Sequence, residues 1–217
     1  MTRDEAVALI QQQMAFRTTL ATEIVTNLQA AQVLLEQEPV KPWFLIAEDS
    51  YIRTEADEER VPVPDDFLEE VDEAVLRYVP DDLTEEAEVD LVKDEYDVLR
   101  KNYADSDTGT ISTGPPEAYC LLGNYFRIFP TPDDDYLIRM IYYKQDDLLT
   151  SNIENGGLKY APFLLLGRAG QMIETPVRDP TAHAEFVRWE AQGRAVLTNK
   201  AVAREMAGRS MQVGGPH

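Results

Sequence analysis

The 217-residue sequence is poor in the side chains that most often carry chemistry: it contains one cysteine, Cys120, and two histidines, His183 and His217. A single cysteine cannot form an internal disulfide, which fits a reducing compartment. Cys120 lies in an apolar run, so we expect a buried, unreactive thiol rather than a nucleophile. His183 is expected to be an ordinary surface histidine.

Long apolar runs and catalytic motifs are also missing. The longest uninterrupted apolar runs span a few residues, whereas a membrane-spanning helix needs about 20. The first residues, M-T-R-D-E, contain acids and no continuous apolar stretch of a secretory signal. The P-loop and the G-x-G-x-x-G, H-E-x-x-H, paired C-x-x-C and G-x-S-x-G motifs are absent. We therefore expect no membrane association, no cofactor and no catalytic residue.

Clustered carboxylates are the remaining candidates for chemistry. Residues 133–135 are three aspartates, and hard cations bind clustered carboxylates. They follow Pro132 in a turn, however, where aspartate is a common residue. The acidic pairs at 69–70, 81–82 and 85–86 could supply the acid and base of a hydrolase, but their spacing also fits a solvated surface. We expect no metal site and no enzyme; a strict divalent-metal requirement would favour the hydrolase.

Basic residues are outnumbered, with 20 Lys and Arg against 40 Asp and Glu, and the net charge is −20. Residues 48–97 hold 21 acidic against four basic residues, whereas residues 159–217 hold eight basic against five acidic. The acidic segment repels nucleic acid. It is either an ordinary solvated surface or one that stays near DNA without binding it. Hydrophobic residues make up 44% of the chain, enough for a folded core.

Helical periodicity opens and closes the sequence. Thr2 and Glu5 fit a T-x-x-E capping box, and apolar residues follow at spacings of three, four or seven: Ile10, Met14, Ala21, Ile24, Leu28, Ala31 and Leu35. This pattern predicts a rod of about 50 Å that prolines stop after residue 38, or two helices with a break near Thr18. A further helix is predicted for residues 160–174, ended by Thr175-Pro176.

The last predicted helix starts with Asp179 as N-cap and Pro180 at the first position, and ends at Gly208. Its inner face is expected to carry Phe186, Trp189, Gly193, Val196, Leu197 and Val202.

The middle of the chain is predicted to be rich in strands. Three runs, at residues 118–122, 125–129 and 136–143, are separated by Gly123-Asn124 and by six residues, which predicts an antiparallel meander. In the second run, residues 125, 127 and 129 are expected to point one way, and residues 126 and 128 the other. Earlier elements are expected as follows: strands at 43–48, 50–56, 67–71 and 75–79, extended chain at 60–64, and a helix within 85–103.

These elements predict an α+β fold, in which a helical bundle of one long N-terminal and two C-terminal helices carries an antiparallel β-region in the middle. We expect a single domain over residues 1–217. The bundle comprises residues 1–38 and 159–207, a β-rich insertion with one helix covers 43–150, and an extended C-terminal tail covers 208–217.

Several segments, in order, resemble the head-to-tail adaptor (connector) proteins of tailed bacteriophages, close to the tail tubular protein A group. The segments that carry the resemblance are 29–36 (Q-A-A-Q-V-L-L-E), 42–45 (P-W-F-L), 63–67 (V-P-D-D-F), 114–119 (G-P-P-E-A-Y), 123–124 (G-N), 129–133 (F-P-T-P-D), 141–143 (I-Y-Y), 164–174 and the helix with Trp189. The resemblance covers most of the chain, but residues 81–97 do not match.

The resemblance implies a structural virion protein at the head–tail interface, made in the host cytoplasm. It would form a homo-oligomeric ring of twelve beneath the portal protein, extend the channel through which DNA passes without specific binding, and contact a tail nozzle or tail tube protein. The acidic segment could then supply one ring contact, opposite the basic last helix, or line the channel.

In such adaptors the C-terminal segment reaches the portal, so the resemblance makes these residues candidates for portal binding: Arg209, Ser210, Met211, Gln212 and Val213. An aperiodic tail can become ordered on binding, although a frayed terminus fits equally well. The alternatives for the whole chain are a tail nozzle or tail-completion protein, and a monomeric acidic binding module of the cytosol.

Overall fold

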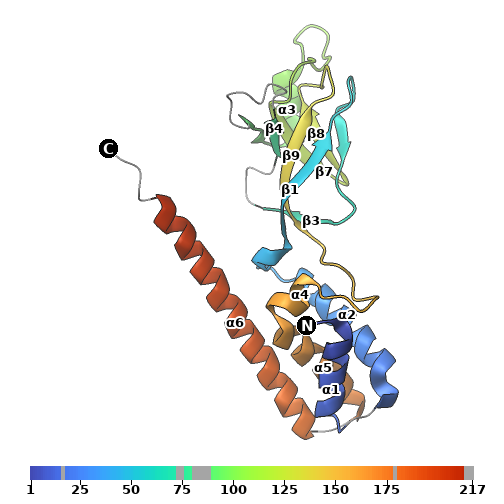
Figure 1. Cartoon of the computed structure of the whole chain (residues 1–217). Helices are drawn as coiled ribbons and strands as arrows, with labels where there is room; N and C mark the ends of the chain where they lie inside the picture. The colour runs from blue at the N-terminus through green and yellow to red at the C-terminus, as the bar shows by residue number, and fades with distance from the viewer. Residues whose placement is uncertain (16–17, 72–75, 80–88, 178–179, 213–217) are drawn as a thin grey trace. The chain divides into compact units, whose positions relative to one another are not determined.

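The computed structural model describes residues 1–15, 18–71, 76–79, 89–177 and 180–212 (Figure 1). The chain divides into two compact units. We call Met1–Leu45 with Asp146–His217 the helical unit, and Ile46–Gln145 the β unit. The chain therefore leaves the helical unit once, builds the β unit, and returns.

The N-terminal part of the helical unit contains two helices, α1 (Arg3–Gln13) and α2 (Ala21–Glu36), with the short 3-10 helix η1 (Thr18–Leu20) before α2. Thr2 caps α1, and the reciprocal capping box with Glu5 is present as predicted. The single rod is wrong, and the alternative with a break is correct. The two helices can fold back on each other, so one core covers both apolar faces.

The C-terminal part adds α4 (Gly156–Tyr160), α5 (Pro162–Val177) and α6 (Pro180–Gln212). The predicted helix start at Pro180 is confirmed, whereas Asp179 lies outside the described residues. Two predicted ends are wrong. The α5 helix includes Pro176, since a proline in the last turn removes only one hydrogen bond. The α6 helix passes through Gly208, which weakens a helix without ending it.

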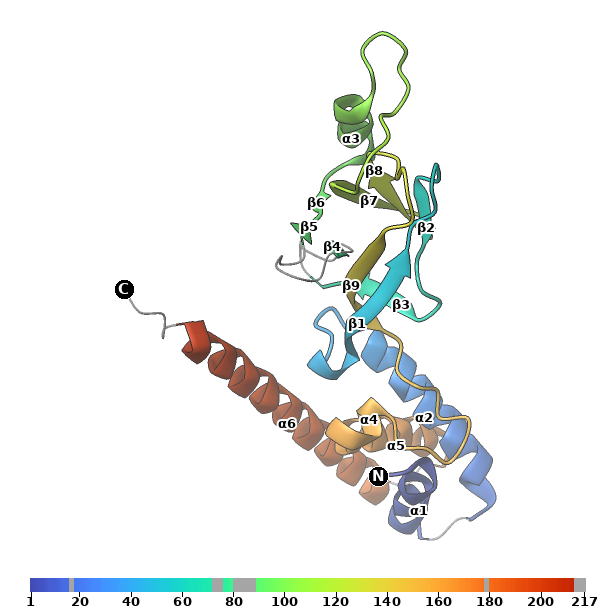
Figure 2. The same ribbon diagram turned by 45° about the horizontal axis from the view of Figure 1, so that its top comes forward.

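The helices of this unit share one core. In Figure 2, α5 lies between α6 on one side and the α1–α2 pair on the other. Fully buried side chains come from every layer, among them Ile10, Leu28, Leu165 and Phe186. On α6 the predicted inner face is correct for Phe186 and the buried Gly193, but Val196 and Val202 are exposed.

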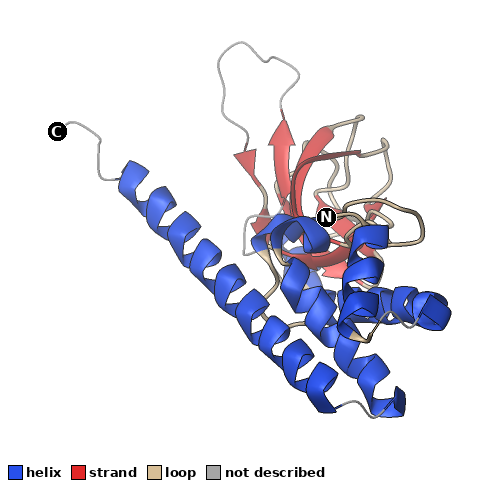
Figure 3. Ribbon diagram, turned by 60° about the horizontal axis from the view of Figure 1, so that its bottom comes forward, coloured by secondary structure: helices blue, strands red, loops and turns tan. Residues whose placement is uncertain are grey.

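The β unit contains all the strands that the structure describes (Figure 3). One sheet has the order β1-β9-β4-β5 with β3 also paired to β9, and the other has the order β2-β8-β7-β6. Their bounds are β1 (Ile46–Arg53), β2 (Arg60–Pro62), β3 (Phe67–Glu70), β4 (Leu76–Val79), β5 (Val89–Asp90), β6 (Val92–Lys93), β7 (Ala118–Leu122), β8 (Tyr125–Phe129) and β9 (Leu137–Lys144). Pairing is antiparallel except between β6 and β7.

The two sheets enclose a core to which both contribute, with Phe126 and Ile128 from β8 and Ile138 and Met140 from β9. On the other face of β8, Phe129 packs with Leu99 of α3 (Tyr96–Tyr103). The predicted alternation along β8 is therefore confirmed. It lets one strand serve two hydrophobic clusters.

The predicted meander is half correct. The β7 and β8 strands form a two-residue hairpin in which Gly123 has the positive φ, 64°, that a tight turn requires. The β9 strand, however, pairs with β1, β3 and β4 in the opposite sheet. Alternating side chains show which face of a strand is buried, and they do not identify the neighbour that pairs with its edge.

Other predicted boundaries also change. Trp43–Leu45 is a 3-10 helix, η2, and the two strands expected within 43–56 are one strand, β1, with a bulge between Ala47 and Ser50. The helix expected within 85–103 is limited to α3, since β5 and β6 precede it. The α+β fold class, with helices at both ends and antiparallel sheets between them, is confirmed.

Candidate interaction surface of the helical unit

Three glycines bring α5 and α6 into close contact. A Cβ atom built on Gly167 would lie 2.4 Å from the backbone N of Glu190, and one on Gly193 would lie 2.3 Å from that of Leu164. A Cβ atom on Gly170 would meet the ring of Phe186 at 2.3 Å. Since real Cβ contacts are longer than 3.0 Å, each position requires glycine. These glycines fix α6 directly against α5.

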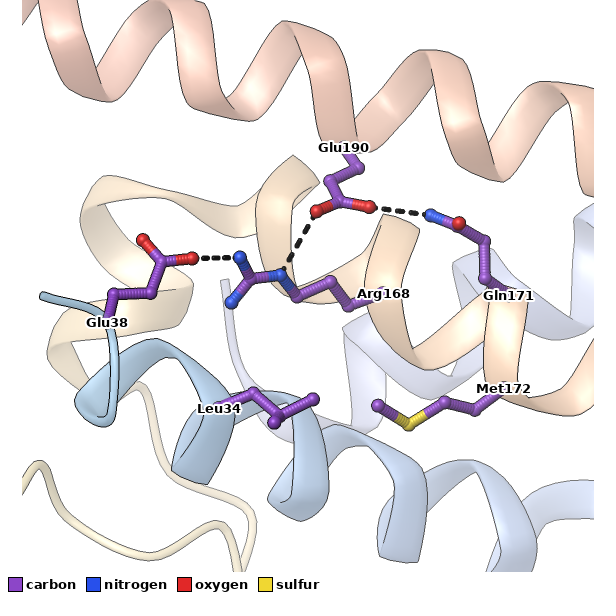
Figure 4. Close-up of a pocket in the computed structure, with 6 residues that line it drawn as sticks. All are labelled: Leu34, Glu38, Arg168, Gln171, Met172 and Glu190. Carbon is purple, nitrogen blue, oxygen red and sulfur yellow. Dashed lines mark hydrogen bonds and ion pairs between the residues drawn. The ribbon is translucent and has the colours of Figure 1, made fainter.

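A charged cluster lies beside this contact (Figure 4). The Arg168 guanidinium on α5 donates to Glu38 after α2 and, through Nε at 3.2 Å, to Glu190 on α6. Gln171 donates to the second Glu190 oxygen at 2.8 Å, and Arg194 lies 3.1 Å from Glu190 and 3.2 Å from Glu38. The cluster therefore ties three chain segments together.

The environment of Glu190 favours its charged form. Burial alone would raise its pKa, but hydrogen bonds from Gln171, Arg168 and Arg194 together outweigh burial, and the pKa is lowered from 4.5. Arg168 has only 9% of its side chain exposed. The two acids and two arginines balance one another, which is the arrangement that a partly buried ionic cluster needs to be stable.

An open pocket of about 550 Å³ adjoins the cluster, and Figure 4 shows Leu34 of α2 and Met172 of α5 below Arg168. Leu34 is 45% exposed. The polar groups in the pocket are already paired in the cluster, apart from the buried Nη1 of Arg168. The pocket therefore presents an apolar surface beside a neutralised charge cluster, and its charged groups are not arranged as a catalytic acid and base.

The far half of α6 is held by the segment after α2. The Arg204 guanidinium lies 3.6 Å from the centroid of the Trp43 ring, a cation–π contact. Trp43 in turn packs edge-on against Phe44 and Tyr160. Val40, at 83% exposure, lies on the rim of a groove of about 430 Å³ that this segment forms with α6. The contact fixes the direction in which α6 leaves the bundle.

The residues expected to bind the portal continue this helix. Arg209, Ser210, Met211 and Gln212 lie in α6, whereas Val213 lies outside the described residues. The extended tail predicted from Gly208 is therefore helical as far as Gln212.

The net charge is divided unequally between the units. The β unit holds 27 acidic and nine basic residues, a net charge of −18, whereas the helical unit holds 13 acidic and 11 basic residues, a net charge of −2. Nearly all of the chain's net negative charge therefore belongs to the β unit. Part of the acidic segment, residues 72–75 and 80–88, lies outside the described residues.

The remaining sequence candidates are Cys120 and Asp133 in the β unit and His183 in α6. Cys120 is buried, and burial raises the pKa of its thiol, so it is a poor nucleophile as predicted. His183 is half-buried in the first turn of α6 rather than exposed. Asp133 accepts a hydrogen bond from the Tyr136 hydroxyl. Among the residues the structure describes, no group of three or more His, Cys, Asp and Glu is arranged to hold a metal ion.

The sequence matches a known protein family. The family model of the SU10 adaptor protein matches residues 1–213. The chain belongs to the SU10 adaptor protein family. No curated protein matched the chain.

This SU10-family chain is a phage head-to-tail adaptor, so the predicted resemblance is confirmed. The family is one of structural virion components that bind other virion proteins. In the part of the chain that is described, no helix has the length and apolarity that crossing a membrane requires.

Sequence reasoning missed the residues that organise the adaptor's helical unit. Gly167 and Gly170 stand one turn apart in an otherwise apolar helix, which is a signal of close helix packing. Arg168 is the only basic residue of α5, and an isolated charge in an apolar helix indicates a buried partner.

Proposed function

We propose that twelve copies of this adaptor form a ring between the portal protein and the tail, where the ring extends the DNA channel. The family match over residues 1–213 carries the proposal. Both compact units are then parts of one adaptor subunit, and a tail nozzle or tail tube protein is the partner on the far side. The role of each surface is mechanical: it holds neighbours together and leaves a passage for DNA.

The proposal assigns the β unit to the DNA channel. Its net charge of −18 repels the phosphate backbone. A channel lined in this way would let DNA pass in both packaging and ejection without binding it.

The C-terminal end of α6 is the proposed contact with the portal, through Arg209, Ser210, Met211, Gln212 and Val213. Arg204, on the turn before these residues, is fixed against Trp43. This end of the helix is therefore presented in a defined direction, which lowers the entropy lost on binding.

The experiment that tests the proposal is mixing the purified chain with purified portal rings and imaging the product by negative-stain electron microscopy. We expect an added ring on one end of the portal, with a mass equal to that of twelve chains of 24.6 kDa. A chain that stays monomeric with portal rings present, at concentrations where related adaptors assemble, would contradict the proposal. Mass measurement of the chain alone serves as the reference.

A further inference from the structure

The outer face of α6 is free of charge over most of its described length. Six exposed residues share this face, opposite the buried Phe186 and Gly193, at spacings of three or four: Ala184, Val187, Ala191, Ala195, Thr198 and Val202. The last two also line the groove that α6 forms with the segment around Trp43. Val187 and Val202 are 44% and 43% exposed. Between Ala191 and Arg204 the helix contains no acidic residue, although acids make up 40 of the 217 residues.

A groove of about 350 Å³ lies on the outer side of the α1–α2 pair. Four of its lining residues are apolar, Val7 and Ala8 from α1 and Ala21 and Val25 from α2. Arg3 and Asp4 also line it and pair with each other at 2.9 Å, and the exposed Glu23 follows the lining residue Thr22 on α2.

The helices that carry the two surfaces have opposite net charge. The α6 helix carries five basic and three acidic residues, whereas α1 and α2 together carry four acidic and one basic residue. Arg188, which is exposed, borders the apolar face of α6, as the exposed Glu23 borders the groove.

The two surfaces also lie on opposite sides of the helical unit, because α5 separates α6 from α1 and α2 (Figure 2). A patch on one side of a subunit that fits a different patch on the other side makes a heterologous contact, the kind that closes into rings.

We infer that the outer face of α6 docks into the α1–α2 groove of a second copy of this chain, and that this contact joins neighbouring subunits. The inference rests on the proposed ring and names its interface. The net charge of −2 on the helical unit lets copies approach through it, whereas β units of −18 repel one another. The basic helix thus finds its acidic partner in α1 and α2.

Cysteine cross-linking tests the interface, because Cys120 is buried and leaves the surface without a described thiol. The test variant carries Ala195→Cys on α6 and Thr22→Cys at the groove, both at exposed positions. Mild oxidation of rings assembled on portal should give a ladder of covalent oligomers on a denaturing gel. Each single variant should give no ladder, and neither should Ala195→Cys combined with Val98→Cys in the β unit.

The outcomes separate this inference from the proposed ring. Rings that assemble on portal but give no ladder overturn the interface and leave the ring standing. If the unsubstituted chain forms no ring on portal, the proposed function fails and the interface fails with it.

Charge exchange provides the second measurement. Arg188→Glu should lower incorporation into rings about tenfold, corresponding to about 1.4 kcal/mol per contact, and Glu23→Lys should act similarly. The double variant, with the two charges exchanged, should recover most of the loss. Equal loss in the single and double variants would contradict the pairing of these two surfaces.

Discussion

At the scale of single residues, the adaptor's helical unit depends on glycines at a close helix contact and on paired charges beside it. Gly167, Gly170 and Gly193 let α5 and α6 approach until backbone meets backbone. Arg168 and Arg194 together neutralise Glu38 and Glu190 beside that contact. The contact between α5 and α6 is therefore rigid, because the glycine positions tolerate no added volume and the charged cluster tolerates no lost charge.

We predict that Gly193→Ala destabilises the helical unit by about 2 kcal/mol, because overpacking outweighs the gain in helix propensity. The added methyl would lie 2.3 Å from the backbone N of Leu164, which cannot rotate away. Thermal unfolding followed by circular dichroism at 222 nm measures the loss. Asn199→Ala, at an exposed site on the same helix, should leave the midpoint nearly unchanged; an equal shift in both variants would refute the packing argument.

The lowered pKa of Glu190 predicts how stability depends on pH. A carboxylate whose pKa is lower in the folded state contributes stability that is fully present above its unfolded pKa, near 4.5, and is lost as pH falls through the folded pKa. The stability of the helical unit should therefore decrease below about pH 4.5. Glu190→Gln removes this contribution, so the unfolding free energy of the variant should change less with pH in acid titrations than that of the unsubstituted chain. An equal decrease of the unfolding free energy in both proteins would exclude Glu190 as a source of the pH dependence.

At the scale of elements, α6 is the part that connects the core to the surfaces proposed for assembly. Its first half packs on α5, whereas Thr198, Val202 and Arg204 in its second half lie beside the segment after α2. One aromatic contact, Trp43 with Arg204, fixes this second half. The helix can therefore carry the C-terminal residues away from the bundle while keeping a defined direction.

We predict that Arg204→Ala loosens the second half of α6 without unfolding the unit. Cation–π contacts contribute about 0.5–2 kcal/mol, so amide hydrogen exchange from Leu197 to Arg204 should become a few-fold to about thirtyfold faster. Exchange in α5 should be unchanged. Lys200→Ala, at an exposed neighbouring position, is the matched control; unchanged exchange in the Arg204 variant would show that the contact does not hold the helix.

At the scale of the whole molecule, the division of charge separates two roles. The nearly neutral helical unit, with a net charge of −2, suits contact with other copies, and the β unit, with −18, suits proximity to DNA. The proposed portal contact, at the end of α6, belongs to the helical unit. Substitutions in one unit should therefore affect the role of that unit and leave the role of the other unit unchanged.

We predict that deleting residues 209–217 leaves the fold intact and lowers attachment to the portal. The deleted residues follow the Trp43–Arg204 contact, and their removal spares the core of the helical unit. Co-sedimentation with portal rings measures attachment, and circular dichroism verifies the fold. Unchanged co-sedimentation of the truncated chain would reject these residues as the portal contact.

The sequence by itself determined those features that depend on neighbours along the chain. The Thr2 capping box, the start of α6 at Pro180, the Gly123-Asn124 hairpin and the alternation along β8 were all predicted correctly. The charge asymmetry and the family resemblance were also present in the sequence. Each of these is a local pattern or a sum over residues.

Only the tertiary structure decided which elements meet. It placed β9 in the sheet opposite β8, divided the expected N-terminal rod into α1 and α2, and brought Arg168 to Glu38 and Glu190. It also set the α1–α2 groove and the free face of α6 on opposite sides of α5. Periodicity shows that a face must be buried, but the partner that buries it is selected by packing among segments distant in sequence.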